Sequence, residues 1–384
     1  MQTILNKCIE NSYNDYGLVA NVSNIYYCTD NEAYENKNVD LGDFIFGAII
    51  ILLLVINGVA TFYDVILRKW TQTNKESGNQ YLLTFSVIQN WERLIQSGHI
   101  DPAYERFASV HGVRSLSSFL TILPHMMLLV GSGFVDNPHD FEKAYYNPFF
   151  YIIVNGTMFV QIYFIVSGSL MTYSLALNDG KRKEKWGFFF KAILYRWIRL
   201  VPSVALLLGF ITTWYRHLGS GPLWEFYTTP VVNDCRRYWW SHILLFNNYI
   251  EDNKYCLLQS WQIAADYQMY SIALALYLGT KKGRGRSLAH FLLFAIGCIA
   301  PALHVWFQNL DGVFILYPEI YRTFKTDNFR KMHVFFYNNL ACFAMGLQLD
   351  SSVPRGGVVI ISDGNPNLHL GGDAGNQDFE AMSF

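Results

Sequence analysis

A polar stripe in an otherwise apolar segment, HGVRSLSSFLTILPH at 111–125, carries the residue types best suited to chemistry. Successive residues of an α-helix step by about 100°, so four polar side chains would fall within about 60° of one another: Arg114, Ser118, Thr121 and His125. Ionisable groups at membrane depth usually face a bundle interior or a water-filled cavity. The stripe therefore predicts a chemically active centre, and hydrogen bonding between neighbouring helices is the alternative.

The composition of the chain indicates a membrane protein. Charged residues make up 15% of the 384 residues and hydrophobic residues 52%, whereas soluble domains carry about 25% charged residues. The net charge of −1 gives no basic footprint, so we expect no nucleic-acid partner. Six cysteines are too few for a disulfide scaffold, and the sequence has no Cys/His spacing typical of a metal site. We predict no metal and no cofactor.

Long apolar stretches predict an all-α fold, a polytopic transmembrane helical bundle of about seven spans. The predicted spans cover 44–67, 115–134, 149–177, 186–215, 261–278, 287–307 and 333–349. Lys and Arg clusters at 68–69, 181–185 and 281–286 place these turns in the cytosol, which puts the N-terminus outside or in the lumen.

The pattern divides the chain into five segments. They are an outer N-terminal tail at 1–43, a first transmembrane helix at 44–67, a cytosolic linker at 68–110, a membrane domain at 111–350 and a disordered tail at 351–384. The N-terminal tail carries an acceptor triplet at Asn21, which predicts a glycoprotein. Apolar residues in the linker recur at helical spacing, which predicts an amphipathic helix on the membrane or against the bundle.

Charged and polar residues in the membrane domain mark its candidate site. Arg114 is predicted near the cytosolic mouth of the second span, and His125 about 16 Å deeper. Arg196 and Arg199 share a helix face, which we place at the cytosolic mouth of the fourth span, with simple snorkelling as the alternative. Asp266 falls in the outer half of the fifth span, where a carboxylate needs a partner or a watery cavity.

The predicted outer loop from 216 to 260 is the longest. Cys235 and Cys256 lie near its two ends, and an oxidising compartment would favour a bridge between them. Such a bridge would contribute on the order of 3 kcal/mol in the chain-entropy model. The segment 239–250 is apolar but too short to cross a bilayer, so we predict that it lies on the surface or re-enters the membrane.

In order and spacing these segments resemble the animal nose resistant to fluoxetine branch of the acyltransferase 3 family. The resemblance rests on HGVRSLSSFLTILPH at 111–125, FIVSG at 164–168, RWIRLVP at 196–202, the loop with Cys235 and Cys256, and WQIAADYQ at 261–268. It extends from the first span to Leu349 and implies that 111–350 is an acyltransferase 3-like membrane domain. Relatives are longer at both ends, so we expect a truncated chain.

The resemblance implies a membrane O-acyltransferase that moves an acyl group from acyl-CoA, as co-substrate, to a hydroxyl of a lipid, sterol or glycan acceptor. Its catalytic residues would be His125 and Arg114. Its substrate-binding residues would be Arg196, Arg199, Ser118, Ser167 and Asp266. A neutral imidazole can take the proton of an attacking hydroxyl, and guanidinium groups bind phosphates bidentately. The expected location is a multi-pass protein of the plasma membrane or endoplasmic reticulum, in contact with membrane lipids.

Gln161 stands where this family commonly has an acidic residue ahead of its Ser-Gly motif. Together with the early end of the membrane domain, this departure favours a second reading, a transporter or carrier of lipids or lipophilic small molecules. An inactive truncated relative is the third.

Overall fold

The computed structural model describes residues 2–13, 39–70, 79–95, 108–132, 146–150, 156–177, 185–220, 224–250, 256–281, 283–312 and 330–351, with a few single positions between them. The predictions for the Asn21 triplet and for the tail beyond 351 lie outside these residues. At the N-terminus, where we predicted only a polar tail, helix α1 spans Gln2–Tyr13.

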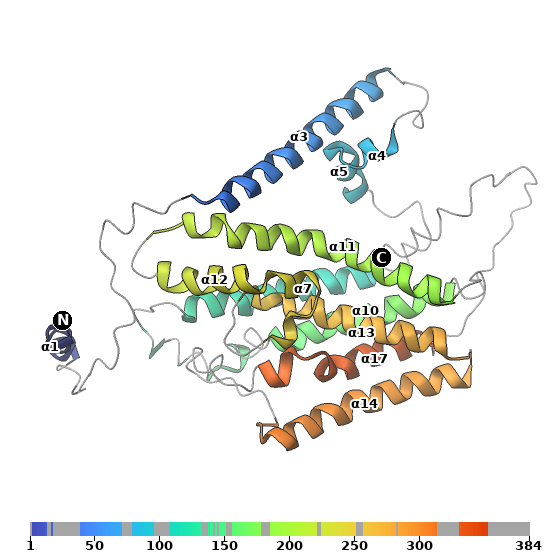
Figure 1. Cartoon of the computed structure of the whole chain (residues 1–384). Coiled ribbons are helices and arrows are strands. Elements are labelled where there is room, and N and C mark those ends of the chain that lie inside the picture. The colour runs from blue at the N-terminus through green and yellow to red at the C-terminus, as the bar shows by residue number, and fades with distance from the viewer. Residues whose placement is uncertain are drawn as a thin grey trace, which may run out of the picture.

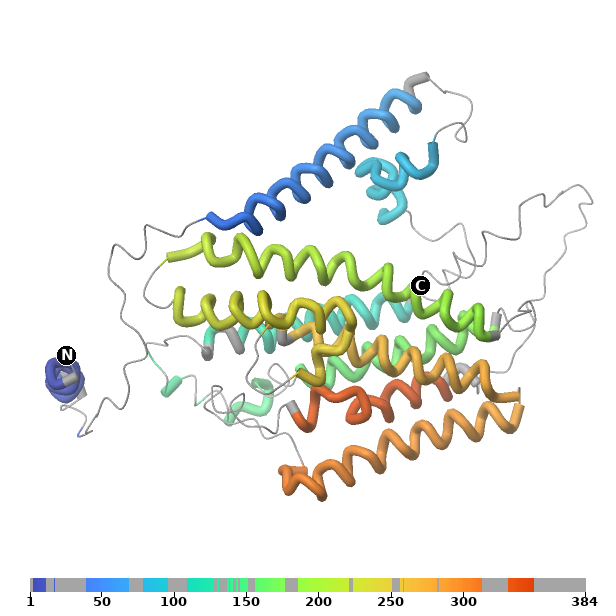
Figure 2. The backbone as a smooth tube through the Cα atoms, viewed as in Figure 1, coloured from blue at the N-terminus to red at the C-terminus, as the bar shows by residue number. Residues whose placement is uncertain are grey.

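The described residues form helices and turns without strands, which confirms the all-α prediction. The long helices that match the predicted spans are α3 (Leu41–Trp70), α7 (Ala108–Ser132), α10 (Gly156–Leu177), α11 (Lys185–Thr212), α13 (Trp261–Gly279), α14 (Arg284–Gln308) and α17 (Phe336–Ser351). Most of them run alongside one another as a bundle, and α3 diverges from it along its length (Figures 1 and 2).

Four helices in the described ranges are long and apolar enough to cross a bilayer: α3, α10, α11 and α14. Large apolar side chains on them are exposed, for example Leu54 of α3 and Phe291 of α14, as expected for surfaces in contact with lipid. The helices α7, α13 and α17 pack alongside but fall short of this criterion. A polytopic helical bundle is therefore confirmed, and the number of spans stays a prediction.

The core of the bundle lies where α10, α13 and α17 meet. Phe164, Met269 and Phe343, one from each helix, are almost fully buried in it. Small residues let the backbones approach closely, since a Cβ at Gly297 of α14 would lie 2.4 Å from the Ala341 nitrogen of α17. Gly168 of α10 plays the same part against α17, since a Cβ there would lie 2.3 Å from the carbonyl oxygen of Phe343.

A helix replaces much of the predicted outer loop. Residues Trp224–Ile243 form α12, which is followed by a short 3-10 turn at Asn247–Tyr249. The buried positions of α12 include Thr228, Val232 and Cys235, spaced four and three residues apart on one face. The prediction of a loop was wrong because polar residues occupy much of this buried face, so no apolar periodicity marks the helix in the sequence.

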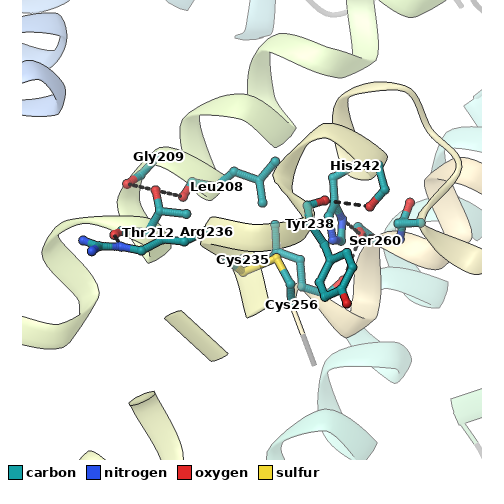
Figure 3. Close-up of a disulfide and its surroundings, with 12 residues drawn as sticks. Leu208, Gly209, Thr212, Cys235, Arg236, Tyr238, His242, Cys256 and Ser260 are labelled. Atoms are coloured by element: carbon teal, nitrogen blue, oxygen red, sulfur yellow. Dashed lines mark hydrogen bonds between the residues drawn. A yellow bond between two sulfur atoms is a disulfide. The ribbon is translucent and has the colours of Figure 1, made fainter. Parts of the chain in front are cut away.

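The Cys235–Cys256 disulfide is present, with the two Cα atoms 4.7 Å apart (Figure 3). It joins the middle of α12 to the turn that precedes α13, and both cysteines are buried. The predicted bridge is thus confirmed.

Both ends of α3 are held by polar contacts. At its start, Arg216 donates to Asp43 at 2.7 Å and Arg236 donates to Asp40 at 2.6 Å. At its end, Arg68 donates to both carboxylate oxygens of Glu92, at 2.6 and 2.8 Å. Glu92 belongs to α5 (Val87–Ile95), the helix found in the predicted amphipathic linker. That linker helix therefore rests against the end of the first span.

Candidate active site

Helix α7 carries its polar stripe at the border between an exposed and a buried face, with Ser118 exposed and Thr121 half-buried. Leu116, Phe119 and Ile122 are about 60% exposed and form the lipid-facing side, whereas Ser117 and Pro124 are buried. Arg114 and His125 are half-buried between these two faces. Pro124 contacts α10, because a Cβ at Gly156 would lie 2.5 Å from its Cγ. The stripe thus borders the contact between α7 and α10.

The stripe residues bond first to their own helix. Ser118 donates to the carbonyl of Arg114 at 2.9 Å, and the ring of His125 bonds through Nδ1 to the carbonyl of Thr121 at 2.7 Å. Bonds of this kind to the preceding turn satisfy the polar side chains within their own helix.

The bond to Thr121 also sets the tautomer of a neutral His125. A carbonyl oxygen can only accept, so Nδ1 must carry the proton and donate it. In the neutral ring Nε2 then holds the lone pair, and it has no hydrogen-bond partner among the described residues. This tautomer of the neutral ring therefore leaves Nε2 as a hydrogen-bond acceptor.

A second contact links the stripe to α10. The hydroxyls of Ser118 and Tyr163 lie 2.6 Å apart, and since Ser118 donates to a carbonyl, Tyr163 donates to Ser118. Tyr163 was not predicted as a site residue, because a tyrosine in an aromatic-rich span gives no distinct signal in the sequence.

Three predicted site residues from three helices meet at one guanidinium. Nη2 of Arg196 on α11 donates to Asp266 of α13 and, at 3.2 Å, to the hydroxyl of Ser167 on α10. The face of Tyr270 lies 4.2 Å from the guanidinium carbon and adds a cation–π contact. The side chains of Arg196 and Asp266 are 25% and 19% exposed. The partner that Asp266 was expected to need is therefore Arg196.

The two arginines of α11 lie near the middle of the helix, several turns from its start. The helix begins at Lys185, so Arg196 follows eleven residues later, about 16 Å along the axis. Arg199 lies a further turn inward. Their location at the cytosolic mouth of the span stays a prediction. An ion pair at this depth costs more to desolvate than one at the surface.

The third arginine of the predicted set belongs to the same region. The positive charges of Arg114 and Arg196 both act on the guanidinium of Arg199. Three guanidinium groups and the Asp266 carboxylate thus share one part of the bundle. This balance of charge favours an anionic ligand.

Gln161 has a structural partner. Its amide donates to Oδ1 of Asn339 on α17 at 2.6 Å, and Asn339 donates in turn to the carbonyls of His333 and Phe335. Asn339 is fully buried. The residue that departs from the family pattern therefore fastens α10 to the start of α17 with uncharged groups.

A second buried polar cluster lies between α12 and α13. The ring Nδ1 of His242 and the hydroxyl of Ser260 are 2.8 Å apart, and Asn247 also donates to Ser260 at 2.9 Å (Figure 3). Burial lowers the pKa of His242 to about 4, which keeps the ring neutral. The sequence did not single out this cluster, because its members are scattered through a segment interpreted as a loop.

The candidate site therefore has two parts, the α7 stripe with His125 and the group around Arg196. Within the described residues no hydrogen bond or ion pair joins His125 to Arg196 or Asp266. In the same ranges no group of three or more His, Cys, Asp or Glu side chains is placed to hold a metal ion.

Long apolar helices with a charged cluster in their interior define an integral membrane protein of the helical-bundle class. The sequence model of the acyltransferase domain family, acyltransferase 3, matches residues 107–355, and the chain belongs to this family. It is similar to nose resistant to fluoxetine protein 6 of Caenorhabditis elegans, with 25% identity over 289 residues. Both comparisons agree with the branch that the motifs indicated.

The aligned region covers 67% of this chain and 34% of the worm protein, so the chain spans about a third of that curated relative. No solved structure gives a significant match.

Proposed function

We propose that the chain is a membrane O-acyltransferase that uses an acyl-CoA thioester as donor and a hydroxyl of a lipid, sterol or glycan as acceptor. The observation that carries the proposal is the convergence of Arg196, Asp266 and Ser167 from three helices, in a bundle whose helix α7 holds a histidine with Nδ1 bonded to a backbone carbonyl. Membership of the acyltransferase family supports it.

The transfer step can be written with His125 as general base. Its Nε2 takes the acceptor proton as the acceptor oxygen attacks the thioester carbonyl, which forms the new C–O bond. The C–S bond then breaks, and the leaving thiolate takes the proton back from the imidazolium. The arginine cluster would hold the phosphates of the donor, and the ion pair with Asp266 would keep Arg196 oriented.

The disulfide supports an orientation for this reaction. A bridge between Cys235 and Cys256 forms in an oxidising compartment, so we place the ends of α11 and α3 near α12 outside the cell or in the lumen. The lysine cluster before α11 then faces the cytosol, in agreement with the positive-inside rule. A cytosolic donor would reach the site from the Lys185 end of α11.

The proposal is tested with the His125→Ala variant of the full chain in membranes. We expect loss of acyl transfer from radiolabelled acyl-CoA of at least a hundred-fold, with insertion and disulfide formation unchanged. The matched control is His139→Ala, since His139 is exposed outside the long helices. Transfer by the His125→Ala variant at the rate of the unaltered chain would contradict the role of His125.

The charge cluster is tested by donor binding. Arg199→Gln should weaken acyl-CoA binding by about ten-fold or more, which corresponds to the loss of one charge-assisted contact of about 1.5–3 kcal/mol. Binding that is absent in the unaltered chain would favour an inactive relative.

A carrier of lipids or lipophilic small molecules is the second candidate. The uncharged Gln161–Asn339 pair favours it, because no acidic side chain is available at this position to orient a catalytic group. A carrier would retain uptake of a fluorescent lipid in the His125→Ala variant. The transferase proposal instead predicts that this variant loses acyl transfer.

A further inference from the structure

A lateral groove lies at the outer end of the bundle, between the start of α3, the second half of α11 and α12. Its volume is about 650 Å³, within the range of about 300–1,000 Å³ that is usual for small-molecule sites. The two halves of the groove differ in chemistry, and neither belongs to the site described above.

The mouth of the groove is polar but carries balanced charge. Asp40 and Arg236 line it as a pair, with Nη2 of Arg236 2.6 Å from the carboxylate, and their side chains are 37% and 40% exposed. Arg236 is fixed there by a second bond, from Nε to the carbonyl of Thr212 at 2.9 Å (Figure 3). Asp40 also lies 3.0 Å from Arg216, which pairs with Asp43, so two cations and two anions lie together at this end. This balance of charge matches a zwitterionic head group.

The remainder of the groove is apolar. Ala205 and Leu208 of α11 face Trp239 and Ile243 of α12 along it. Its inner end approaches the charged site, because the Ile243 carbonyl accepts a 2.9 Å hydrogen bond from Trp197, the neighbour of Arg196.

The groove also continues into surfaces that face lipid. Leu206 and Leu207, adjacent to the lining residues of α11, are 43% and 47% exposed, and Trp239 is 53% exposed. Tryptophans are typical of the membrane–water interface, and Trp214 also lies at this end of the bundle. An occupant can therefore enter sideways from the outer leaflet.

We propose that this groove binds a single-chain membrane amphiphile with a zwitterionic head group, the head at the Asp40–Arg236 pair and the chain between α11 and α12. Size, charge balance and continuity with the lipid-facing surface together select this class of ligand. The proposal concerns binding alone and does not depend on acyl transfer.

The test uses a photoactivatable lysophosphatidylcholine with its reactive group in the acyl chain, added to the full chain in phosphatidylcholine nanodiscs. We expect saturable labelling of the peptides that contain Leu208 and Ile243, and its loss when unlabelled lysophosphatidylcholine is added in excess. Ala205→Trp, which fills the groove, should lower this labelling at least ten-fold. Leu206→Trp makes a similar change on the adjacent lipid-facing position and should leave the labelling unchanged.

Three outcomes would overturn the proposal: labelling that unlabelled lipid does not compete, equal labelling of the exposed face of α14, or full labelling of a folded Ala205→Trp variant. Folding is checked by the mobility of the disulfide-bonded form on a non-reducing gel. If Ala205→Trp does not fold, competition in the unaltered chain decides. No transfer chemistry enters this assay, so a failed proposal for acyl transfer would leave its result unaffected.

Discussion

Gly168 of α10 and Gly346 of α17 face each other so closely that neither position has room for a side chain. A Cβ at Gly168 would lie 2.3 Å from the carbonyl oxygen of Phe343, and one at Gly346 would lie 2.1 Å from that of Ile165. The obstacle in both cases is backbone, which cannot move aside as a flexible side chain can. The Ser169 hydroxyl also donates to the Gly346 carbonyl at 3.1 Å. This contact sets the distance between α10 and α17.

The first prediction concerns this contact. Gly168→Ala should destabilise the detergent-solubilised protein by about 3 kcal/mol, at the upper end of overpacking effects, because two backbones must separate. The measurement is thermal unfolding followed by a thiol-reactive dye. Gly58→Ala is the matched control, since Gly58 lies in α3 with open space around its Cα. It should be neutral or stabilising by up to about 1 kcal/mol, as helix propensity predicts. Equal effects of the two changes would contradict the prediction.

The second prediction concerns the Arg196–Asp266 pair. Asp266→Asn should destabilise the protein by about 3–5 kcal/mol, because it leaves the guanidinium of Arg196 desolvated without its counter-charge. The double variant Arg196→Met with Asp266→Leu should recover most of this loss, since it removes both charges and fills the space with apolar atoms. Thermal unfolding of the two variants measures the difference. Additive losses in the double variant would show that the two charges do not depend on each other.

The third prediction concerns pH and His242. The pKa of this buried histidine falls from about 6.5 in the unfolded chain to about 4 in the folded protein. The folded state therefore favours the neutral ring, and its contribution to stability is complete above pH 6.5. It is lost as the pH falls from 6.5 to 4, in total on the order of 3 kcal/mol.

The measurement is unfolding stability against pH for the unaltered chain and for His242→Gln. The variant should show a shallower decline between pH 6.5 and 4, with His139→Gln as the exposed control. Identical pH profiles for all three proteins would rule out the assigned role of His242.

The fourth prediction concerns the disulfide. Cys235→Ser together with Cys256→Ser should lower stability by about 3 kcal/mol, as expected for a closed loop of this length. Labelling of the groove peptides should also fall, because α12 loses its covalent attachment ahead of α13. Cys298→Ser is the control, since Cys298 is an exposed free thiol and its removal should change neither quantity. A serine pair as stable as the unaltered chain would contradict the prediction.

The sequence predicted the positions of the long helices because their apolar stretches are long and bounded by basic clusters. It also predicted the disulfide, because Cys235 and Cys256 fall in one predicted outer segment, where an oxidising compartment would favour a bridge. Asp266 was marked as a carboxylate in need of a partner by its position in an apolar span. Its partner could not be read from the sequence, since it comes from another helix and depends on how α11 and α13 are rotated.

Local pattern was not sufficient in two places. In α12, hydroxyl and histidine side chains take buried positions and satisfy one another, so the helix lacks an apolar stripe. In α11, the sequence left open whether Arg196 snorkels to the membrane surface, and the structure pairs it with Asp266 of α13. In both cases tertiary hydrogen bonds or ion pairs stabilise buried side chains that composition alone would place on a water-exposed surface.

The contact between Pro124 and Gly156 has an evolutionary consequence. The proline ring fills the volume in which any side chain at position 156 would have to fit, so the two positions share one fixed volume. Homologues with a larger residue at 156 should therefore carry a smaller one at 124, and a substitution at either position alone should be purged. Such paired substitutions at 124 and 156 would show that the contact between α7 and α10 is kept in homologues that retain the histidine after the proline.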